Sequence, residues 1–103
     1  MRSLRFLAAA LAEYDRAVEW HAERSPEAAA EFVATVERTL ARIRELPGVA
    51  QEWPGRPELR RQLLGRFPYS IIYLLRDDDD GVVILAMAHT SRTPGYWLGR
   101  LRR

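Results

Sequence analysis

The sequence predicts one α+β domain, residues 1–103, with elements in the order β-α-α-β-β-β and a C-terminal tail. Two observations support this prediction. Between residues 8 and 46 the apolar side chains recur at a helical period, with a single break at Ser25-Pro26. After a loop at 47–57 that holds three prolines and two glycines, the period becomes two, which is typical of strands. We therefore expect an antiparallel sheet with one face packed against a helical hairpin.

Both predicted helices carry an apolar stripe. The first spans about 8–23, and Glu13 lies off its stripe, which is formed by Leu7, Leu11, Tyr14 and Val18. The second begins at Ser25-Pro26-Glu27, where a serine cap, a proline at the first helical position and an acidic first turn coincide. It ends near Leu46, before a Pro-Gly pair. Its side chains expected to be mostly buried are Val33, Val36, Leu40 and Ile43.

Four short segments are predicted as strands, at residues 3–7, 59–64, 69–76 and 82–89. The acidic run Asp77–Asp80 and the glycine after it join the last two as a hairpin turn. The tail, from Pro94 to Arg103, is expected to form a helical turn or two and to contribute little to the core. The strand side chains expected to be mostly buried are Ile72, Leu74, Val83 and Leu85.

The composition excludes several classes of protein. The chain has no cysteine, which rules out a disulfide framework, a cysteine-based zinc or iron–sulfur site and a thiol nucleophile. No apolar stretch is long enough to span a membrane, and the run Phe6–Ala12 is short for a signal peptide. Adjacent acids in Asp77–Asp80 point apart, so we expect a solvated turn rather than a metal site. We expect a cytoplasmic protein without a metal or other cofactor.

Charge is distributed unevenly along the chain. All sixteen basic residues are arginine, whose planar guanidinium suits phosphate, carboxylate and base edges. Residues 1–51 hold seven arginines and eight acids, whereas residues 52–103 hold nine arginines and six acids. The C-terminal half therefore suits an anionic partner, either nucleic acid or an acidic peptide, and a solvated arginine-rich surface is the alternative.

The candidates for chemistry are two histidines and a set of arginines. His21 lies near the apolar stripe of the first helix and is expected to pack there. His89 ends the last apolar strand, where it serves either as a general acid or base or as a hydrogen-bonding group that fixes the corner. If the strands are neighbours, one basic face with stacking aromatic rings is expected from Arg60, Arg61, Arg66, Arg92, Tyr96 and Trp97.

Five segments in order carry a family resemblance: Ala12–Trp20, Ser25–Glu27, Leu59–Arg61, Arg66–Tyr73 and Ala88–Trp97. Together they resemble the RelE/ParE superfamily, the toxins of bacterial type II toxin–antitoxin pairs, and look closest to the ParE or "plasmid stabilization protein" branch. The resemblance covers nearly the whole chain. It implies a small antiparallel sheet on a helical hairpin and a cognate antitoxin as partner in a hetero-oligomer.

The resemblance also divides the expected function. RelE-type toxins cut mRNA on the ribosome with a set of cations, whereas ParE-type toxins inhibit DNA gyrase. Arg61 matches one nuclease cation, but Leu63 and Ser70 stand where others belong. The resemblance therefore favours a gyrase inhibitor that is not an enzyme. On this hypothesis the residues that bind the partner or nucleic acid are Arg60, Arg61, Arg66, Arg92, Tyr96, Trp97 and Arg100.

Two alternatives remain from the sequence. In a ribosome-dependent mRNA endoribonuclease, His89 or Tyr96 would handle protons, and Arg61 and Arg92 would stabilise charge on the phosphate. In the other alternative the chain is an inactive interaction domain. No firm catalytic residue follows from the sequence.

Overall fold

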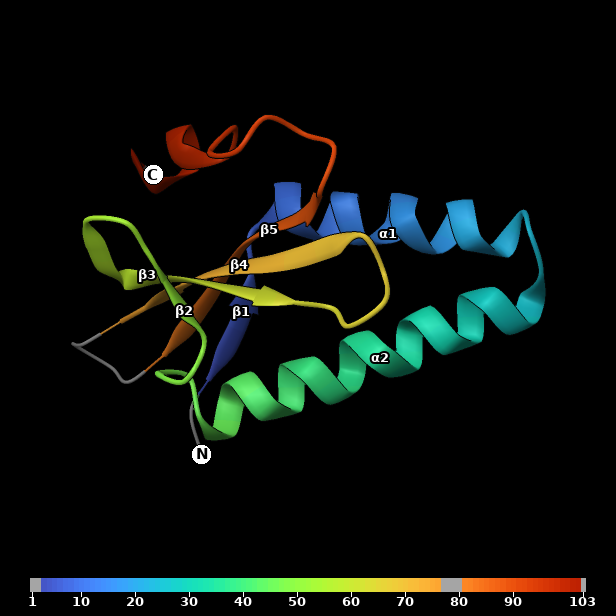
Figure 1. The fold of residues 1–103 in the computed structure, drawn as a ribbon, viewed down its shortest axis with the longest axis horizontal. Helices are drawn as coiled ribbons and strands as arrows, with labels where there is room; N and C mark the ends of the chain where they lie inside the picture. The colour runs from blue at the N-terminus through green and yellow to red at the C-terminus, as the bar shows by residue number, and fades with distance from the viewer. Residues whose placement is uncertain (1–2, 77–80, 103) are drawn as a thin grey trace.

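The computed structural model describes residues 3–76 and 81–102 and confirms the predicted α+β class. The predicted turn at Asp77–Asp80 lies outside the described residues. Figure 1 shows the sheet between α2 and the C-terminal segment. The elements are β1 (Leu4–Phe6), α1 (Ala8–Ala22), α2 (Pro26–Glu45), β2 (Gln51–Trp53), β3 (Arg56–Leu63), β4 (Tyr69–Leu75), β5 (Val82–His89) and a final 3₁₀ helix η1 (Leu98–Arg102).

The sheet has five strands in the order β1-β5-β4-β3-β2. Strands β2 to β5 pair antiparallel, but β1 runs parallel to β5, so the sheet is mixed rather than wholly antiparallel. The predicted loop at 47–57 contains a further edge strand, β2, which sequence reasoning missed. Gly55, directly after Pro54, takes a φ of 78° and allows the tight turn from β2 into β3.

Helix α2 begins at the predicted cap. The Ser25 hydroxyl accepts a hydrogen bond of 2.9 Å from the backbone N–H of Ala28, and Pro26 occupies the first helical position.

Neither helix within residues 3–76 and 81–102 has the length and apolar character needed to cross a bilayer.

Replacing Ser25 with alanine is expected to lower the free energy of unfolding by about 1 kcal/mol, because the Ala28 N–H loses its acceptor. Urea unfolding followed by circular dichroism measures this change. Ser25→Asp keeps an acceptor and should unfold near the wild-type midpoint. An alanine variant as stable as the wild type would contradict the role of the cap.

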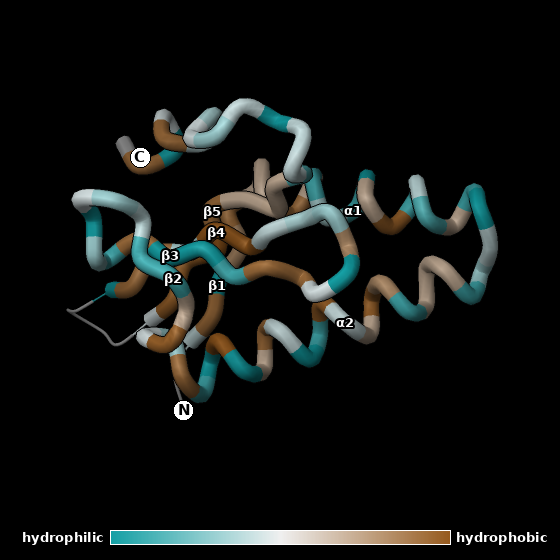
Figure 2. The backbone as a smooth tube through the Cα atoms, in the orientation of Figure 1, coloured by the Kyte–Doolittle hydropathy of each residue, from teal (hydrophilic) through white to brown (hydrophobic). Residues whose placement is uncertain are grey.

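The sheet is covered on both faces, which makes two hydrophobic clusters. Helices α1 and α2 cover one face, and the buried core there includes Ala17, Phe32, Val36, Ile71 and Ile84. On the other face, the C-terminal segment covers a cluster of Leu59, Ile72, Val83, Leu85, Ala86 and Trp97. Figure 2 shows hydrophobic residues along the central strands β4 and β5, which have a layer on each side.

Burial corrects several sequence predictions. Val36, Ile43, Ile72, Val83 and Leu85 are buried as predicted, whereas the other three predicted core residues are only half-buried: Val33, Leu40 and Leu74. The prediction that the tail contributes little to the core is wrong, because Trp97 is 2% exposed.

The inward face of α1 also differs from the prediction. The buried residues are Ala10, Glu13, Ala17 and His21, while Leu11 is 46% exposed. The two alanines leave room for α1 to approach β5, and the glutamate between them points inward. His21 packs as predicted: its ring stacks on Phe32 at 4.4 Å, and Nδ1 donates to the carbonyl of Ala17.

Candidate functional site

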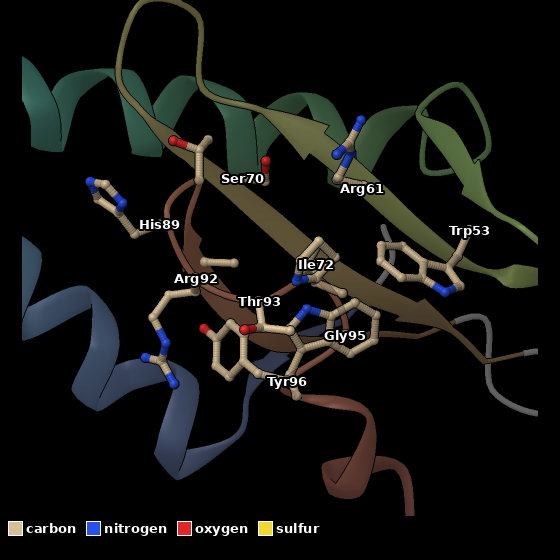
Figure 3. A pocket seen from close by; sticks show the side chains of 13 residues that line it. Trp53, Arg61, Ser70, Ile72, His89, Arg92, Thr93, Gly95 and Tyr96 are labelled. Atoms are coloured by element: carbon tan, nitrogen blue, oxygen red, sulfur yellow. The ribbon is translucent and has the colours of Figure 1, made fainter.

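A cavity of about 110 Å³ opens on the sheet face covered by the C-terminal segment (Figure 3). Its walls come from β2, β3, β4, the end of β5 and the segment that follows. Arg61, Ser70, His89, Arg92 and Tyr96 line it together, so the structure brings the predicted nuclease candidates into one groove. A second hollow of about 220 Å³ lies on the α1 side and shares His89 and Arg92.

The alternation of strand β3 decides which arginine faces this groove. Arg61 pairs in register with Ile72, whose side chain belongs to the cluster under the C-terminal segment. Its Nη2 donates to Gln51 Oε1 at 2.9 Å across to β2. Arg60 pairs with Tyr73 and points to the opposite face, because successive strand side chains alternate.

Arg60 and Arg66 therefore do not extend the predicted basic face. The Arg60 guanidinium donates to the carbonyls of Gly48 and Ala50 at 2.6 and 2.9 Å, which secures the chain before β2. Arg66 forms an ion pair with Glu31 on α2 and lies over the ring of Phe67. Both guanidinium groups are engaged on the helix side of the sheet.

His89 lies at the end of β5, opposite Tyr69. Its Nδ1 accepts a hydrogen bond of 3.0 Å from the backbone N–H of Ser91, and the Ser91 hydroxyl lies 2.8 Å from the same nitrogen. The Tyr69 ring meets the imidazole edge to face, with centroids 4.9 Å apart. Because an N–H can only donate, Nδ1 is the acceptor, and a neutral ring carries its proton on Nε2. His89 thus fixes the corner after β5.

Arg92 follows this corner and is exposed. Its guanidinium carbon lies 3.8 Å from the centroid of the Tyr96 ring, a cation–π contact. Within the described parts of the chain, its side chain forms no ion pair or hydrogen bond. Arg92 is therefore a cation held over an aromatic ring and available to an anionic partner. In Figure 3 its side chain extends from the groove toward α1.

The hydroxyl of Tyr96 is committed to a buried carboxylate. It donates to Glu13 Oε2 at 2.6 Å. Burial, the hydrogen bond to Glu13 and the charge of that carboxylate raise the pKa of Tyr96 to about 12. A phenol with this pKa holds its proton throughout the physiological range and is poorly suited to general acid–base catalysis.

Sequence reasoning missed Glu13, which is 7% exposed. The carboxylate pairs with the guanidinium of Arg100 through two contacts of 3.0 Å. Burial alone would raise the pKa of Glu13, but the hydrogen bonds from Arg100, Tyr96 and the N–H of Met87 outweigh it and hold the pKa below its usual range. The spacing in the sequence could have indicated its burial, because Glu13 falls on the same helical face as Ala10 and Ala17.

Two predicted binding residues are structural. Trp97 packs in the cluster under the C-terminal segment, against the edge of Trp53 at a centroid distance of 4.9 Å. Arg100 is engaged by Glu13 and by the carbonyl of Leu85. Among the described residues, no three histidine, aspartate or glutamate side chains converge on a possible metal position.

The fold of a helical hairpin on one face of a small mixed sheet is shared with solved structures of toxins. The Pseudomonas aeruginosa structure "Chromosomal ParDE TA system" matches with a TM-score of 0.65 and 22% identity, covering 86% of this chain and 96% of that chain. An Escherichia coli RelE mutant in complex with a RelBc antitoxin peptide matches with a TM-score of 0.65 and 18% identity, covering 95% of this chain and 93% of that chain. The isolated E. coli RelE toxin matches with a TM-score of 0.59 and 16% identity, covering 99% of this chain and 98% of that chain.

The family model described as "ParE toxin of type II toxin-antitoxin system, parDE" matches residues 4–94. The chain belongs to this family and is a ParE-type toxin of a type II toxin–antitoxin system. The predicted family is thus confirmed. A comparison with curated proteins found no match.

Proposed function

We propose that this toxin inhibits DNA gyrase by binding it, without catalysis, and that a cognate antitoxin neutralises it by covering the same surface. The surface consists of Arg61, His89 and Arg92 with the ring of Tyr96, and we call it the Arg92 face. Membership of the ParE family supports gyrase as the target.

The hydrogen bond between the Tyr96 hydroxyl and Glu13 is the main support for a toxin that acts without catalysis. RNA cleavage by attack of a 2′-hydroxyl needs a base, an acid and charge stabilisation at one phosphate. The Tyr96 hydroxyl is held by Glu13, and the Nδ1 atom of His89 is held by Ser91. With Tyr96 engaged, Nε2 of His89 is the one proton-transfer group left among the predicted candidates, which is too few to supply both a base and an acid, so the groove suits binding better than cleavage.

Charge supports the antitoxin part of the proposal. Arg92 is exposed, and Arg61 lines the same cavity. An acidic antitoxin segment crossing this face would associate faster and in a defined register because of complementary charge. A hetero-oligomer of toxin and antitoxin in the bacterial cytoplasm follows from this proposal.

The second candidate is a ribosome-dependent mRNA endoribonuclease. One observation favours it: His89, Arg61 and Arg92 do line a single cavity, together with Ser70. The similarity in fold to RelE agrees with this candidate as well as with the first. An interaction domain without either activity is the third outcome.

Two assays on the purified toxin distinguish these candidates. We expect it to block supercoiling by purified gyrase and to leave mRNA intact on programmed ribosomes. Cleaved mRNA at the ribosomal A site that disappears in His89→Ala would overturn the gyrase proposal in favour of the nuclease. Inactivity in both assays would favour the interaction domain.

Arg92→Ala is expected to raise the toxin concentration for half-maximal gyrase inhibition by about tenfold, because an arginine held over an aromatic ring is a typical interface hot spot. Arg42→Ala removes an equal charge from the exposed surface of α2 and should change the value less than about twofold. Equal effects of the two variants would show that only net charge matters and would contradict the assignment of the Arg92 face.

A further inference from the structure

Two backbone groups of β5 lie past the end of the neighbouring strand. β1 pairs with β5 only as far as Phe6, which stands opposite Ile84. The N–H of Met87 and the carbonyl of Leu85 lie beyond this point. Leu85 also lies in a bulge, because the register with β4 passes from Ala86 directly to Ile84. Backbone polar groups at such a place require partners from outside the sheet.

Glu13 and Arg100 supply those partners. Glu13 Oε1 accepts from the N–H of Met87 at 3.0 Å, and Arg100 Nη1 donates to the carbonyl of Leu85 at 2.8 Å. The two side chains form a bidentate pair, and Tyr96 donates to the second carboxylate oxygen. A single buried carboxylate thus joins α1, the bulge of β5 and the C-terminal segment.

The same contacts fix the position of Arg92. Its guanidinium rests on the Tyr96 ring, and that ring is held through its hydroxyl by Glu13. Glu13 lies inside the family match, whereas Tyr96 and Arg100 lie beyond its end at residue 94. The dependence of the Arg92 face on Glu13 is therefore evident only from the structure.

We infer that Glu13 is the positioning residue of this toxin: it clamps the C-terminal segment to the β5 bulge and so holds Tyr96 and Arg92 in the geometry that binds the target. This inference rests on the proposed function. Glu13 itself is too buried to contact gyrase, so its effect on inhibition passes through the segment that it holds.

The test compares inhibition of supercoiling by Glu13→Ala, Arg100→Ala and the double variant. We expect each single variant to raise the half-inhibitory concentration at least about tenfold, and the double variant to be no worse than either single one, since both break one clamp. Glu13→Gln keeps one acceptor oxygen, which can serve either the Met87 N–H or the Tyr96 hydroxyl, and should be partly active. Glu19→Ala removes an exposed acid from the same helix and should behave as wild type.

Two further measurements separate positioning from general destabilisation. Val36→Ala weakens the core on the opposite face of the sheet and serves as a control for lost stability. At a temperature where both variants are folded, we expect Val36→Ala to retain inhibition of gyrase and Glu13→Ala to lose it. Amide hydrogen exchange should show faster exchange in Glu13→Ala at Met87 and in residues 96–101, with α2 still protected.

The outcomes are distinct. Full inhibition by Glu13→Ala, or unchanged exchange in residues 96–101, would overturn the clamp. Loss of inhibition in Arg100→Ala alone would also overturn it, because it would mean that Arg100 contacts gyrase directly. If the wild-type toxin does not inhibit gyrase, the proposed function fails instead, and hydrogen exchange in Glu13→Ala alone then decides for or against the clamp.

Discussion

A chain that ends at Gly95 is expected to lose most of its stability, because the removed segment closes one of the two hydrophobic clusters. Trp97 is among the largest fully buried side chains and packs with Leu59, Ile72 and Leu85. Removing a buried tryptophan typically costs about 3–5 kcal/mol. A domain of this size has a total stability of about 5–15 kcal/mol. The truncated chain should therefore be unfolded or nearly so.

The backbone before Trp97 contributes to its placement. Gly95 has a φ of 83°, and a Cβ added there would lie 3.0 Å from the side chain of Leu98. The left-handed conformation allows the chain to turn back so that Trp97 reaches the sheet. The loss of this segment removes a part of the fold as well as a part of the surface.

Urea unfolding of the chain ending at Gly95, compared with Trp97→Ala and with a chain lacking only residues 102–103, tests this prediction. The first two should unfold at much lower urea concentrations than the third. Wild-type stability of the Gly95 chain would show that the second cluster is dispensable. The result also bears on function: lost gyrase inhibition in this truncation would report unfolding and would not identify a binding segment.

The second large effect is expected at Glu13. Alanine there leaves the Met87 N–H without its acceptor and the Arg100 guanidinium without its carboxylate, in a largely buried place. Breaking one side of such a pair costs about 2–4 kcal/mol. Glu13→Gln should cost less, because it removes the charge but keeps an acceptor. Glu19→Gln, on the exposed side of α1, should change the stability little.

This stabilisation depends on pH in a defined direction. Burial alone would raise the pKa of Glu13, but the hydrogen bonds from Arg100, Tyr96 and Met87 hold this pKa below its ordinary value near 4.5. The contribution is therefore present above about pH 4.5 and is lost as the pH falls through the lowered pKa. Tyr96 has the opposite dependence, at alkaline pH. The fold raises its pKa from 10 to about 12, so its contribution to the folding stability is lost as the pH rises over that interval.

Urea unfolding of wild type and Glu13→Gln at neutral and acidic pH measures this dependence. The difference in unfolding free energy should shrink in acid, because protonated Glu13 is close in shape and charge to glutamine. A difference that stays constant with pH would show that the Glu13 charge contributes nothing. Glu19→Gln provides the comparison for general effects of acid on the chain.

The sequence by itself determined the order and limits of most elements. The Ser25-Pro26 start of α2, the strand at 69–75 and the strand at 82–89 were predicted within a residue or so, since each is specified by local patterns of capping and alternation. The family was also predicted from the sequence. Among the residues that line the groove, the sequence indicated Arg61, His89, Arg92, Tyr96 and Trp97.

The tertiary structure alone decided what the charged residues do. Arg60 and Arg61 are neighbours in sequence, yet one secures a loop and the other lines the groove, because the strand places them on opposite faces. The sequence places Glu13 off the apolar stripe and does not indicate its role, because its partners, Met87 and Arg100, lie more than seventy residues away in sequence. Local patterns describe the period of a segment. Whether a charge can be buried depends on hydrogen-bond and ion-pair partners that offset its desolvation, and only the packed fold brings such distant groups together.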